Sequence, residues 1–433
     1  AAVAARHRWP ASVGRIRGIT GLLIEATVAG ASIGDIIEVE RSSGGDRPLR
    51  CEVVGVSRGA VQAIGLGPLD GVCLGASVRV KHELRDFPAG DALLGRVLDP
   101  FGRPIDGEPP PSCDARTPID APAPALEDRA LVNTVFETGV RVIDGLLTCG
   151  RGQRVGIFAG AGVGKSVLVE QVARQSKADV VVVGLIGERG REVRELASNR
   201  TDGSMVIVAA TSDRSPMERV RGARAATAVA EHFSTRGANV LLIIDSLTRY
   251  GMALREIGLA LGEPAATKGY TPSVFAELPR LLERASMFTN GGSITGFYTV
   301  LVEGDDLSDP IADAARSLLD GHVVLDRELA GRAHFPAVDV LSSASRVITA
   351  VCAQETLELA LWARATLAER RQVAELVSLG AYLPGTNPDF DQVLSLGNRL
   401  DEWARQAAAV RSDRTATLAG LEQALNSSEE NAR

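Results

Sequence analysis

The chain has 433 residues, which is more than one ordinary hydrophobic core holds, so two or three domains are expected. Hydrophobic residues make up 45% of it and charged residues 23%, as in ordinary globular proteins, whereas aromatic residues make up only 4%. The cores must therefore consist mainly of aliphatic side chains. The net charge of −7 gives no electrostatic reason to expect nucleic-acid binding.

The five cysteines are scattered, with no CxxC pair and no Cys/His spacing. This argues against a zinc site and a disulfide framework, and it suits a reducing cytosol. No apolar run approaches the roughly 18–20 residues that cross a bilayer. The first eight residues lack the long apolar segment of a secretory signal.

Residues 11–81 contain short β-type segments separated by Gly, Asp or Ser turns. Six strands at this spacing predict a small barrel or sandwich. Without an aromatic platform or a basic stripe, an oligonucleotide-binding role is disfavoured. The expected strands are Ser12–Arg17, Leu22–Thr27, Ile36–Glu40, Leu49–Val56, Val61–Ile64 and Ser77–Val80.

Residues 86–130 are rich in Pro and Gly and predict an extended, semi-rigid linker. From about residue 150, apolar strands alternate with helical stretches such as Met217–Phe233 and Ile311–Leu319. This alternation predicts a parallel sheet covered by helices on both faces, with the chemistry at the carboxyl ends of the strands. The expected strands are Val155–Phe158, Val180–Ile186, Met205–Ala209, Val240–Ile244 and Ile294–Val302.

After about residue 351, helix-forming residues dominate, with an interruption from Gly380 to Pro388. The predicted fold is therefore α/β, with an N-terminal β-barrel over 1–85, an α/β core over 86–350 that includes the linker, and a helical domain over 351–433.

The segment AGAGVGKS (159–166) has the order of a phosphate-binding loop: strand, glycine-rich turn, Lys, hydroxyl, helix. Lys165 would reach the terminal phosphates and Ser166 would ligate Mg²⁺, while the helix N-terminus adds a positive dipole. The strict pattern has Gly where this chain has Ala159, a small departure because three glycines remain. The expected nucleotide-binding residues of this loop are Gly160, Ala161, Gly162, Val163, Gly164, Lys165, Ser166 and Val167.

Two carboxylates follow aliphatic strands at the expected active edge. Asp245 ends the run from Val240, the arrangement that holds Mg²⁺, although a helix N-cap looks the same in sequence. Glu188 comes 23 residues after Lys165, where hydrolysis needs a group that orients water. The alternative for Glu188 is a helix-start carboxylate paired with Arg189 or Arg191.

Two arginines have open assignments. Arg249 follows Asp245 closely and could lie near the γ-phosphate, or it could be a solvated arginine at a helix start. Arg346 lies far beyond the five strands, and spacing alone makes an ordinary surface ion pair its default role.

Together these motifs resemble the ATPase of bacterial type III protein secretion, a family shared with flagellar export ATPases and related to the rotary ATP synthase catalytic subunit. The resemblance covers nearly the whole chain and rests on long strings: GIFAGAGVGKS (156–166), LIGERGREVRE (185–195), ATSDRSPMERVR (210–221), REIGLALGEP (255–264), SVFAELPRLLERA (273–285), YTVLVEGDDLSDPIAD (298–313) and LDGHVVL (319–325).

The resemblance implies a RecA-like ATPase core between an oligomerising barrel and a helical domain, with ATP and Mg²⁺ at the interfaces of a homohexamer or stacked double ring. In that family, Glu188 matches the catalytic glutamate, and Arg346 matches an arginine finger reaching the adjacent subunit. Arg189 and Arg249 match arginines that line the site beside Lys165. Phe335 matches the aromatic position against adenine, although a core Phe is equally natural.

The resemblance also implies partners: central stalk and stator proteins and chaperone–effector complexes, at the cytoplasmic face of the inner membrane. Residues 258–264 and 304–309 match pore-facing loops, with solvated loops that cap helices as the alternative. Flagellar export is the nearest alternative function, and we favour the injectisome because of the VLVEGDD and TSDRSPMERV strings. A rotary synthase subunit and a hexameric nucleic-acid translocase are more distant.

Overall fold

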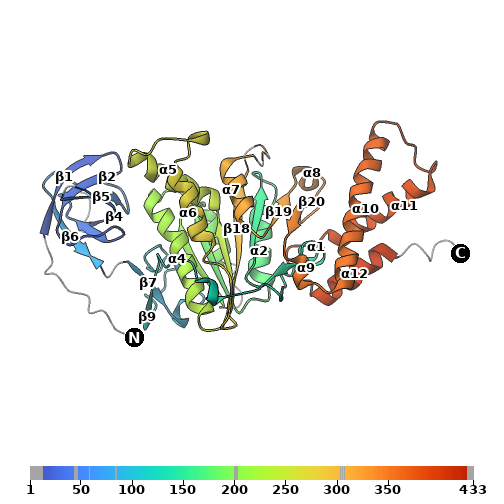
Figure 1. Cartoon of the computed structure of the whole chain (residues 1–433), viewed down its shortest axis with the longest axis horizontal. Coiled ribbons are helices and arrows are strands. Elements are labelled where there is room, and N and C mark those ends of the chain that lie inside the picture. The colour runs from blue at the N-terminus through green and yellow to red at the C-terminus, as the bar shows by residue number, and fades with distance from the viewer. Residues whose placement is uncertain are drawn as a thin grey trace.

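The computed structural model describes residues 13–42, 47–57, 59–82, 85–198, 203–302, 304, 306 and 308–426. Three parts follow one another along its long axis: a β-barrel, a sheet covered by helices, and a group of helices (Figure 1). Among the described residues, no helix combines the length and the hydrophobicity that crossing a membrane requires.

The N-terminal part is a closed six-stranded barrel in the order β1-β2-β5-β4-β3-β6. Alternate side chains such as Ile24, Ala26 and Ile37 fill its interior, as period-2 patterning requires. All six predicted strands are present, and because the sheet closes on itself, the barrel is confirmed and the sandwich is excluded. Ser12, the predicted start of the first strand, lies outside the described residues. The strands are β1 (Val13–Thr20), β2 (Leu23–Thr27), β3 (Ile36–Val39), β4 (Leu49–Ser57), β5 (Ala60–Gly65) and β6 (Ser77–Lys81).

The central sheet has the order β20-β19-β13-β18-β16-β14-β15-β8. Along this order the strands are parallel except for β20, which pairs antiparallel with β19. Outside this order, the short strand β17 (Met287–Phe288) pairs antiparallel with β18. The strands are β8 (Val97–Leu98), β13 (Arg154–Ala159), β14 (Val180–Ile186), β15 (Met205–Ala210), β16 (Asn239–Asp245), β18 (Ser293–Leu301), β19 (Gly321–Leu325) and β20 (Val338–Ser345).

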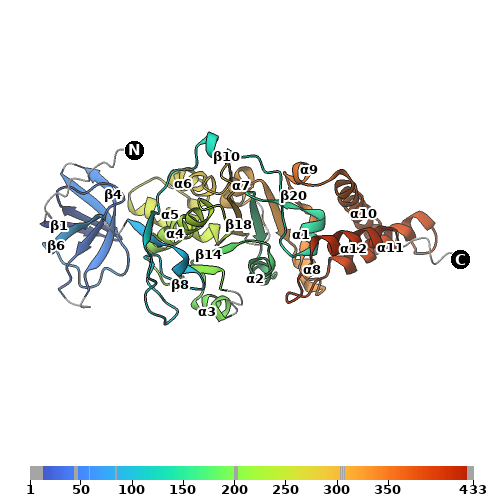
Figure 2. The same cartoon turned by 90° about the horizontal axis from the view of Figure 1, so that it is seen from below.

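Helices cover both faces of this sheet (Figures 1 and 2), which is why β14 and β16 are aliphatic on both sides. The helices of this central part are α1 (Arg141–Leu146), α2 (Lys165–Gln175), α3 (Gly190–Ser198), α4 (Pro216–Ser234), α5 (Leu247–Ala260), α6 (Pro272–Leu282), α7 (Pro310–Leu318), α8 (Arg327–Gly331) and α9 (Ile348–Val351), with a short 3₁₀ helix at Thr267–Gly269. The five predicted strands and both predicted helices are confirmed to within a few residues.

The predicted linker over 86–130 is only partly an extended connection. β8 within it adds an edge strand to the central sheet beside β15. β7 (Asp86–Ala89) pairs with β9 (Ala115–Pro118), and β10 (Arg129–Ala130) pairs with β17 (Met287–Phe288). Two 3₁₀ helices, Asp91–Leu93 and Leu126–Asp128, lie in the same stretch, and β11 (Val135–Phe136) pairs with β12 (Cys149–Gly150) just beyond it. These pairings involve distant strands, which local composition does not reveal.

The C-terminal part consists of α10 (Gln354–Ser378), α11 (Pro388–Ala404) and α12 (Arg414–Asn426). The predicted interruption is present: Gly380 has a φ of 69°, and Pro388 opens α11 after its cap Asn387. The domain limits at 85/86 and 350/351 stay predictions.

Candidate active site

The phosphate loop connects the end of β13 to the start of α2. Gly162 and Gly164 have φ values of 78° and 101°, which L side chains rarely adopt. Apart from its two chain neighbours, no described residue has an atom within 4 Å of the place where a Cβ on Gly162 would stand, so the loop is open at that point. Ala159 is buried at the end of β13, where its methyl group is accommodated, so the departure from the strict pattern leaves the turn intact.

Lys165, Glu188 and Asp245 meet in one buried cluster at the carboxyl edge of the sheet. Their side chains are 10%, 9% and 4% exposed. Lys165 Nζ lies 3.3 Å from Glu188 Oε1 and donates a short hydrogen bond to Asp245 Oδ1. Burial alone would lower the pKa of Lys165, but the two carboxylates outweigh it and raise that pKa. The lysine is therefore a firmly charged group.

Glu188 faces the lysine rather than a neighbouring arginine. β14 ends at Ile186, and Glu188 follows the left-handed Gly187. Arg191 instead pairs with Glu195 at 3.3 Å, and the side chain of Arg189 is exposed, so the helix-start pairing expected as the alternative is absent from the described residues. Burial raises the pKa of Glu188; Lys165 opposes the rise and Asp245 adds to it.

Arg249 lies beside this cluster. A Cβ on Gly187 would stand 3.0 Å from Arg249 Cβ, so the arginine packs against the turn that carries Glu188. Arg249 Nε is buried and has no hydrogen-bond partner among the described residues. This does not fit a fully solvated arginine at a helix start, and it leaves a donor available beside the turn that carries Glu188.

Asp245 and Ser166 offer oxygen atoms suited to Mg²⁺. Asp245 Oδ1 accepts hydrogen bonds from Lys165 and, at 2.6 Å, from Thr299, while Oδ2 accepts none from the described residues. Ser166 is exposed on the first turn of α2. A free carboxylate oxygen and a hydroxyl are hard ligands of the kind Mg²⁺ takes, so these residues fit the ion.

Phe335 is a surface residue beside the phosphate loop. Its side chain is 46% exposed, so it is not the core residue that the alternative supposed. A Cβ on Gly164 would stand 3.6 Å from Phe335 Cε1. Val167, on the first turn of α2, is also exposed. A planar base above the loop would find apolar surface here, so the adenine assignment stays a prediction with suitable geometry.

The structure does not bring Arg346 to this cluster. In the pairing of β19 with β20, Ser345 lies opposite Gly321, which in turn pairs with Val155 near the start of β13. Arg346 therefore stands at the amino edge of the sheet, opposite the phosphate loop of its own chain. Its Nη2 donates a 3.2 Å hydrogen bond to the carbonyl of Arg316, and no ion pair holds it among the described residues.

Two residues near the loop escaped the sequence motifs. Thr299 on β18 donates to Asp245, and Arg327 Nη1 donates to the carbonyl of Ala161 at 3.2 Å. Thr295 and Tyr298 on the same strand also carry hydroxyls, so the sequence did not single out Thr299. Arg327 reaches the loop only through the pairing of β19 with β13, and the sequence offers no sign of that pairing.

The two predicted pore loops show partial helix capping. Asp309 accepts a 2.9 Å hydrogen bond from the backbone of Ile311 and caps α7. Glu263 accepts from the backbone of Ser273 at 3.2 Å. Asp306 lies 3.5 Å from Lys268, and Leu259 is exposed. Asp309 and Glu263 therefore each accept a hydrogen bond from the first turn of a helix, while Asp305 and Leu307 lie outside the described residues.

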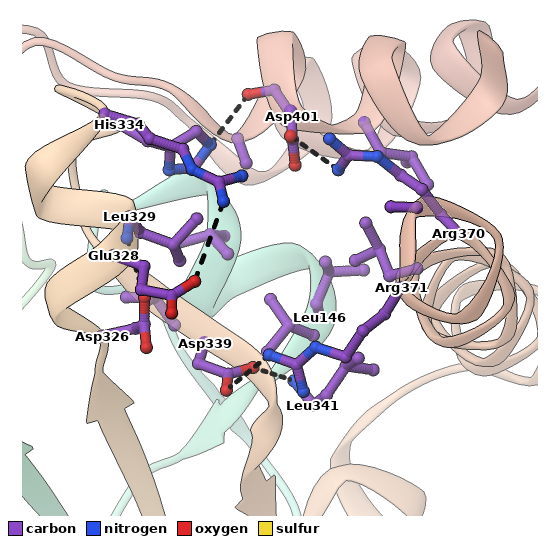
Figure 3. A pocket seen from close by; sticks show the side chains of 18 of the residues that line it. Leu146, Asp326, Glu328, Leu329, His334, Asp339, Leu341, Arg370, Arg371 and Asp401 are labelled. Atoms are coloured by element: carbon purple, nitrogen blue, oxygen red, sulfur yellow. Dashed lines mark hydrogen bonds and ion pairs between the residues drawn. The ribbon is translucent and has the colours of Figure 1, made fainter. Parts of the chain in front are cut away.

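A separate cavity of about 460 Å³ lies between the sheet and the C-terminal helices (Figure 3). Its charged groups face one another: Arg371 pairs with Asp339 at 3.3 Å and Arg370 with Asp401 at 2.6 Å. His334 Nε2 donates to the backbone carbonyl of Asp401. The contacts of Arg371 and His334 join the helical part to the core, whereas the Arg370–Asp401 pair joins α10 to α11. None of the predicted catalytic residues lines the cavity.

Comparison with known proteins agrees with this geometry. Residues 139–345 match the ATP synthase alpha/beta family nucleotide-binding domain, and residues 352–423 match the T3SS EscN ATPase C-terminal domain. The chain is 46% identical to the flagellum-specific ATP synthase of Salmonella typhimurium, covering 94% of this chain and 92% of the relative. It is 44% identical to the type 3 secretion system ATPase of Pseudomonas savastanoi pv. phaseolicola, with the same coverage.

Among solved structures, the assembled ATPase EscN of the enteropathogenic E. coli type III secretion system matches with a TM-score of 0.89 and 40% identity, over 95% of this chain and 100% of that one. EscN in complex with its central stalk EscO matches with a TM-score of 0.87 and 39% identity, over the same shares of the two chains. The chain therefore belongs to the ATP synthase alpha/beta family, in the branch of the type III secretion ATPases, and is an ATP-hydrolysing enzyme.

Proposed function

We propose that this chain hydrolyses Mg-ATP at the interfaces of a homohexameric ring and thereby energises type III secretion, releasing chaperones and feeding unfolded effector proteins to the export apparatus. The catalytic part of this proposal is supported by one observation: Lys165 donates hydrogen bonds to both Glu188 and Asp245 beside an open phosphate loop.

The negatively charged phosphates of ATP would complement the phosphate loop. Its phosphates would lie on the backbone N–H groups of residues 160–166, at the N-terminus of α2. Lys165 would exchange its carboxylate partners for the terminal phosphates. This exchange frees Glu188, whose raised pKa makes it a better proton acceptor than an ordinary glutamate, to orient the attacking water.

Other residues then complete the site. Ser166 and Asp245 would hold Mg²⁺, which when bound neutralises charge on the phosphates. Arg249 and Arg189 would line the phosphates, and Phe335 would contact adenine. Because Arg346 lies at the far edge of its own sheet, we assign it to the neighbouring subunit's site.

The relatives support part of the proposed assembly. EscN has been solved assembled and with its stalk EscO, which supports a ring with a central stalk protein for this chain. A stacked double ring, a stator protein and chaperone–effector complexes complete the proposal. Residues 258–264 and 304–309 would face the axis, and partners would hold the ring at the cytoplasmic face of the inner membrane. We propose no nucleic-acid partner.

The decisive experiment measures ATP turnover with Mg²⁺ as protein concentration rises. Turnover per chain should increase as rings form. Stimulation by single-stranded RNA but not by chaperone–effector complexes would instead favour a translocase.

The choice between injectisome and flagellum needs a second experiment, because relatives of both kinds match. The gene should restore effector secretion to a strain that lacks its injectisome ATPase. Restored motility in a strain lacking its flagellar ATPase, without restored effector secretion, would overturn the injectisome assignment.

A further inference from the structure

Thr299 lies between the two strands that carry the phosphate loop and Asp245. β18 pairs with β13 on one side and β16 on the other, so that Thr299 is level with Ile157 and one residue beyond the pair of Tyr298 with Ile244. The Thr299 side chain is fully buried. Its hydroxyl donates to Asp245 Oδ1 at 2.6 Å, with the carbonyl of Ile244 at a longer 3.5 Å.

Asp245 Oδ1 thus has two donors of different kinds. Lys165 is charged and is also needed by the phosphates. Thr299 is neutral, and the other acceptor for its hydroxyl, the carbonyl of Ile244, is farther away at 3.5 Å. When Lys165 turns to a nucleotide, only Thr299 continues to hold Oδ1. Oδ2, which accepts no hydrogen bond from the described residues, then stays directed away from that anchor.

We propose that Thr299 is a positioning residue that fixes the Asp245 carboxylate for the metal in the nucleotide-bound state. This inference rests on the proposed metal role of Asp245. Hydrogen-bond partners of ligating groups typically matter by about 10–100-fold in metal affinity or activity, so the effect is measurable.

The test replaces the hydroxyl with a methyl group of nearly the same size. In the ADP-bound protein, Thr299→Val should weaken Mn²⁺ affinity, measured by electron paramagnetic resonance, by about tenfold or more, and Thr299→Ser should restore most of it. Thr295→Val is the matched control: Thr295 is also fully buried on β18, but its hydroxyl accepts from the backbone of Gly152 at 3.0 Å, away from the site.

Each outcome decides something. Unchanged Mn²⁺ affinity in Thr299→Val overturns the inference, including the case in which only thermal stability falls. An equal loss in Thr295→Val, or a Ser variant no better than Val, also overturns it. Asp245→Asn distinguishes a failure of the proposed metal role from a failure of the Thr299 inference. If Asp245→Asn keeps wild-type Mn²⁺ affinity, the metal role of Asp245 is wrong. If Asp245→Asn loses Mn²⁺ affinity while Thr299→Val does not, only the role of Thr299 is wrong.

Discussion

Each edge of the central sheet carries a cluster of charged side chains, and the two clusters differ in their balance of positive and negative charge. At the amino edge, Glu283 pairs with Arg129 at 2.6 Å and with Arg154, which also pairs with Asp320 at 2.9 Å. Burial alone would raise the pKa of Glu283, but hydrogen bonds from the two arginines lower it. Two cations there balance two anions.

At the carboxyl edge, one lysine faces two carboxylates. Burial raises the pKa of Glu188, and the negative charge of Asp245 adds to the rise, while Lys165 opposes it. The carboxyl-edge cluster is also the more buried of the two: the side chain of Glu188 is 9% exposed and that of Glu283 is 32% exposed. Burial and charge balance together set the direction of each carboxylate pKa. A lowered pKa accompanies the balanced cluster that stabilises the fold, and a raised pKa accompanies the cluster with an excess carboxylate.

The largest effect is expected from Arg346, which lies at the amino edge of the sheet with the structural cluster but is proposed to act in catalysis. In assembled rings, Arg346→Ala should lower kcat by about 10³-fold or more, the range of arginine fingers, although it lies at the structural edge of its own chain. Turnover is measured across protein concentrations, with Arg316→Ala on exposed α7 as the control. Unchanged ring-dependent turnover would return Arg346 to a structural role.

The second-largest effect on kcat is expected from Glu188, in the cluster at the carboxyl edge. Glu188→Gln should lower kcat by about 10²–10⁴-fold while nucleotide binding persists, because the amide neither accepts a proton nor carries charge. Turnover and nucleotide affinity are measured on the same preparation. Normal hydrolysis by this variant would contradict the assignment.

The pH dependence of turnover tests the raised pKa of Glu188. Glu188 must be ionised to orient water, and its pKa is raised, so kcat/KM should begin to fall above the ordinary glutamate pKa of about 4.3 as pH decreases. The pH–rate profile tests this, with circular dichroism confirming that the protein stays folded. A flat profile down to that pH would show that Glu188 does not limit the rate.

The smallest effect belongs to the balanced edge. Glu283→Gln should lower the free energy of unfolding by about 1–2 kcal/mol, since the pair is partly solvated, and leave kcat unchanged. Because the pKa of Glu283 is lowered, this stabilisation is present above the ordinary glutamate pKa and lost as pH falls through the folded value. Urea unfolding measures it, and Arg280→Ala, from an exposed pair with Glu277, should change stability by about 0.5 kcal/mol or less.

Sequence patterning predicted the strands whose periodicity is strong. β14 was located at its observed limits because seven consecutive residues are apolar or Gly. β20 was missed because polar residues such as Asp339 and Ser342 interrupt its alternation, and β8 because two residues carry no period. Local signals report local conformation, whereas edge strands depend on a partner that is distant in sequence.

The site divides in the same way. Lys165, Glu188 and Asp245 follow strands, so the topology of a parallel sheet already placed them together. Thr299 and the edge on which Arg346 stands depend on strand register, which the sequence pattern leaves undetermined.

The opposed positions of the phosphate loop and Arg346 have a consequence for assembly. If Arg346 serves its neighbour, each chain is two half-sites facing away from each other. An open arc of such chains leaves an unmatched half at each end, and adding subunits never removes the deficit. Only closure into a circle leaves no half-site unused, so enzymatic yield itself favours the ring over any linear polymer.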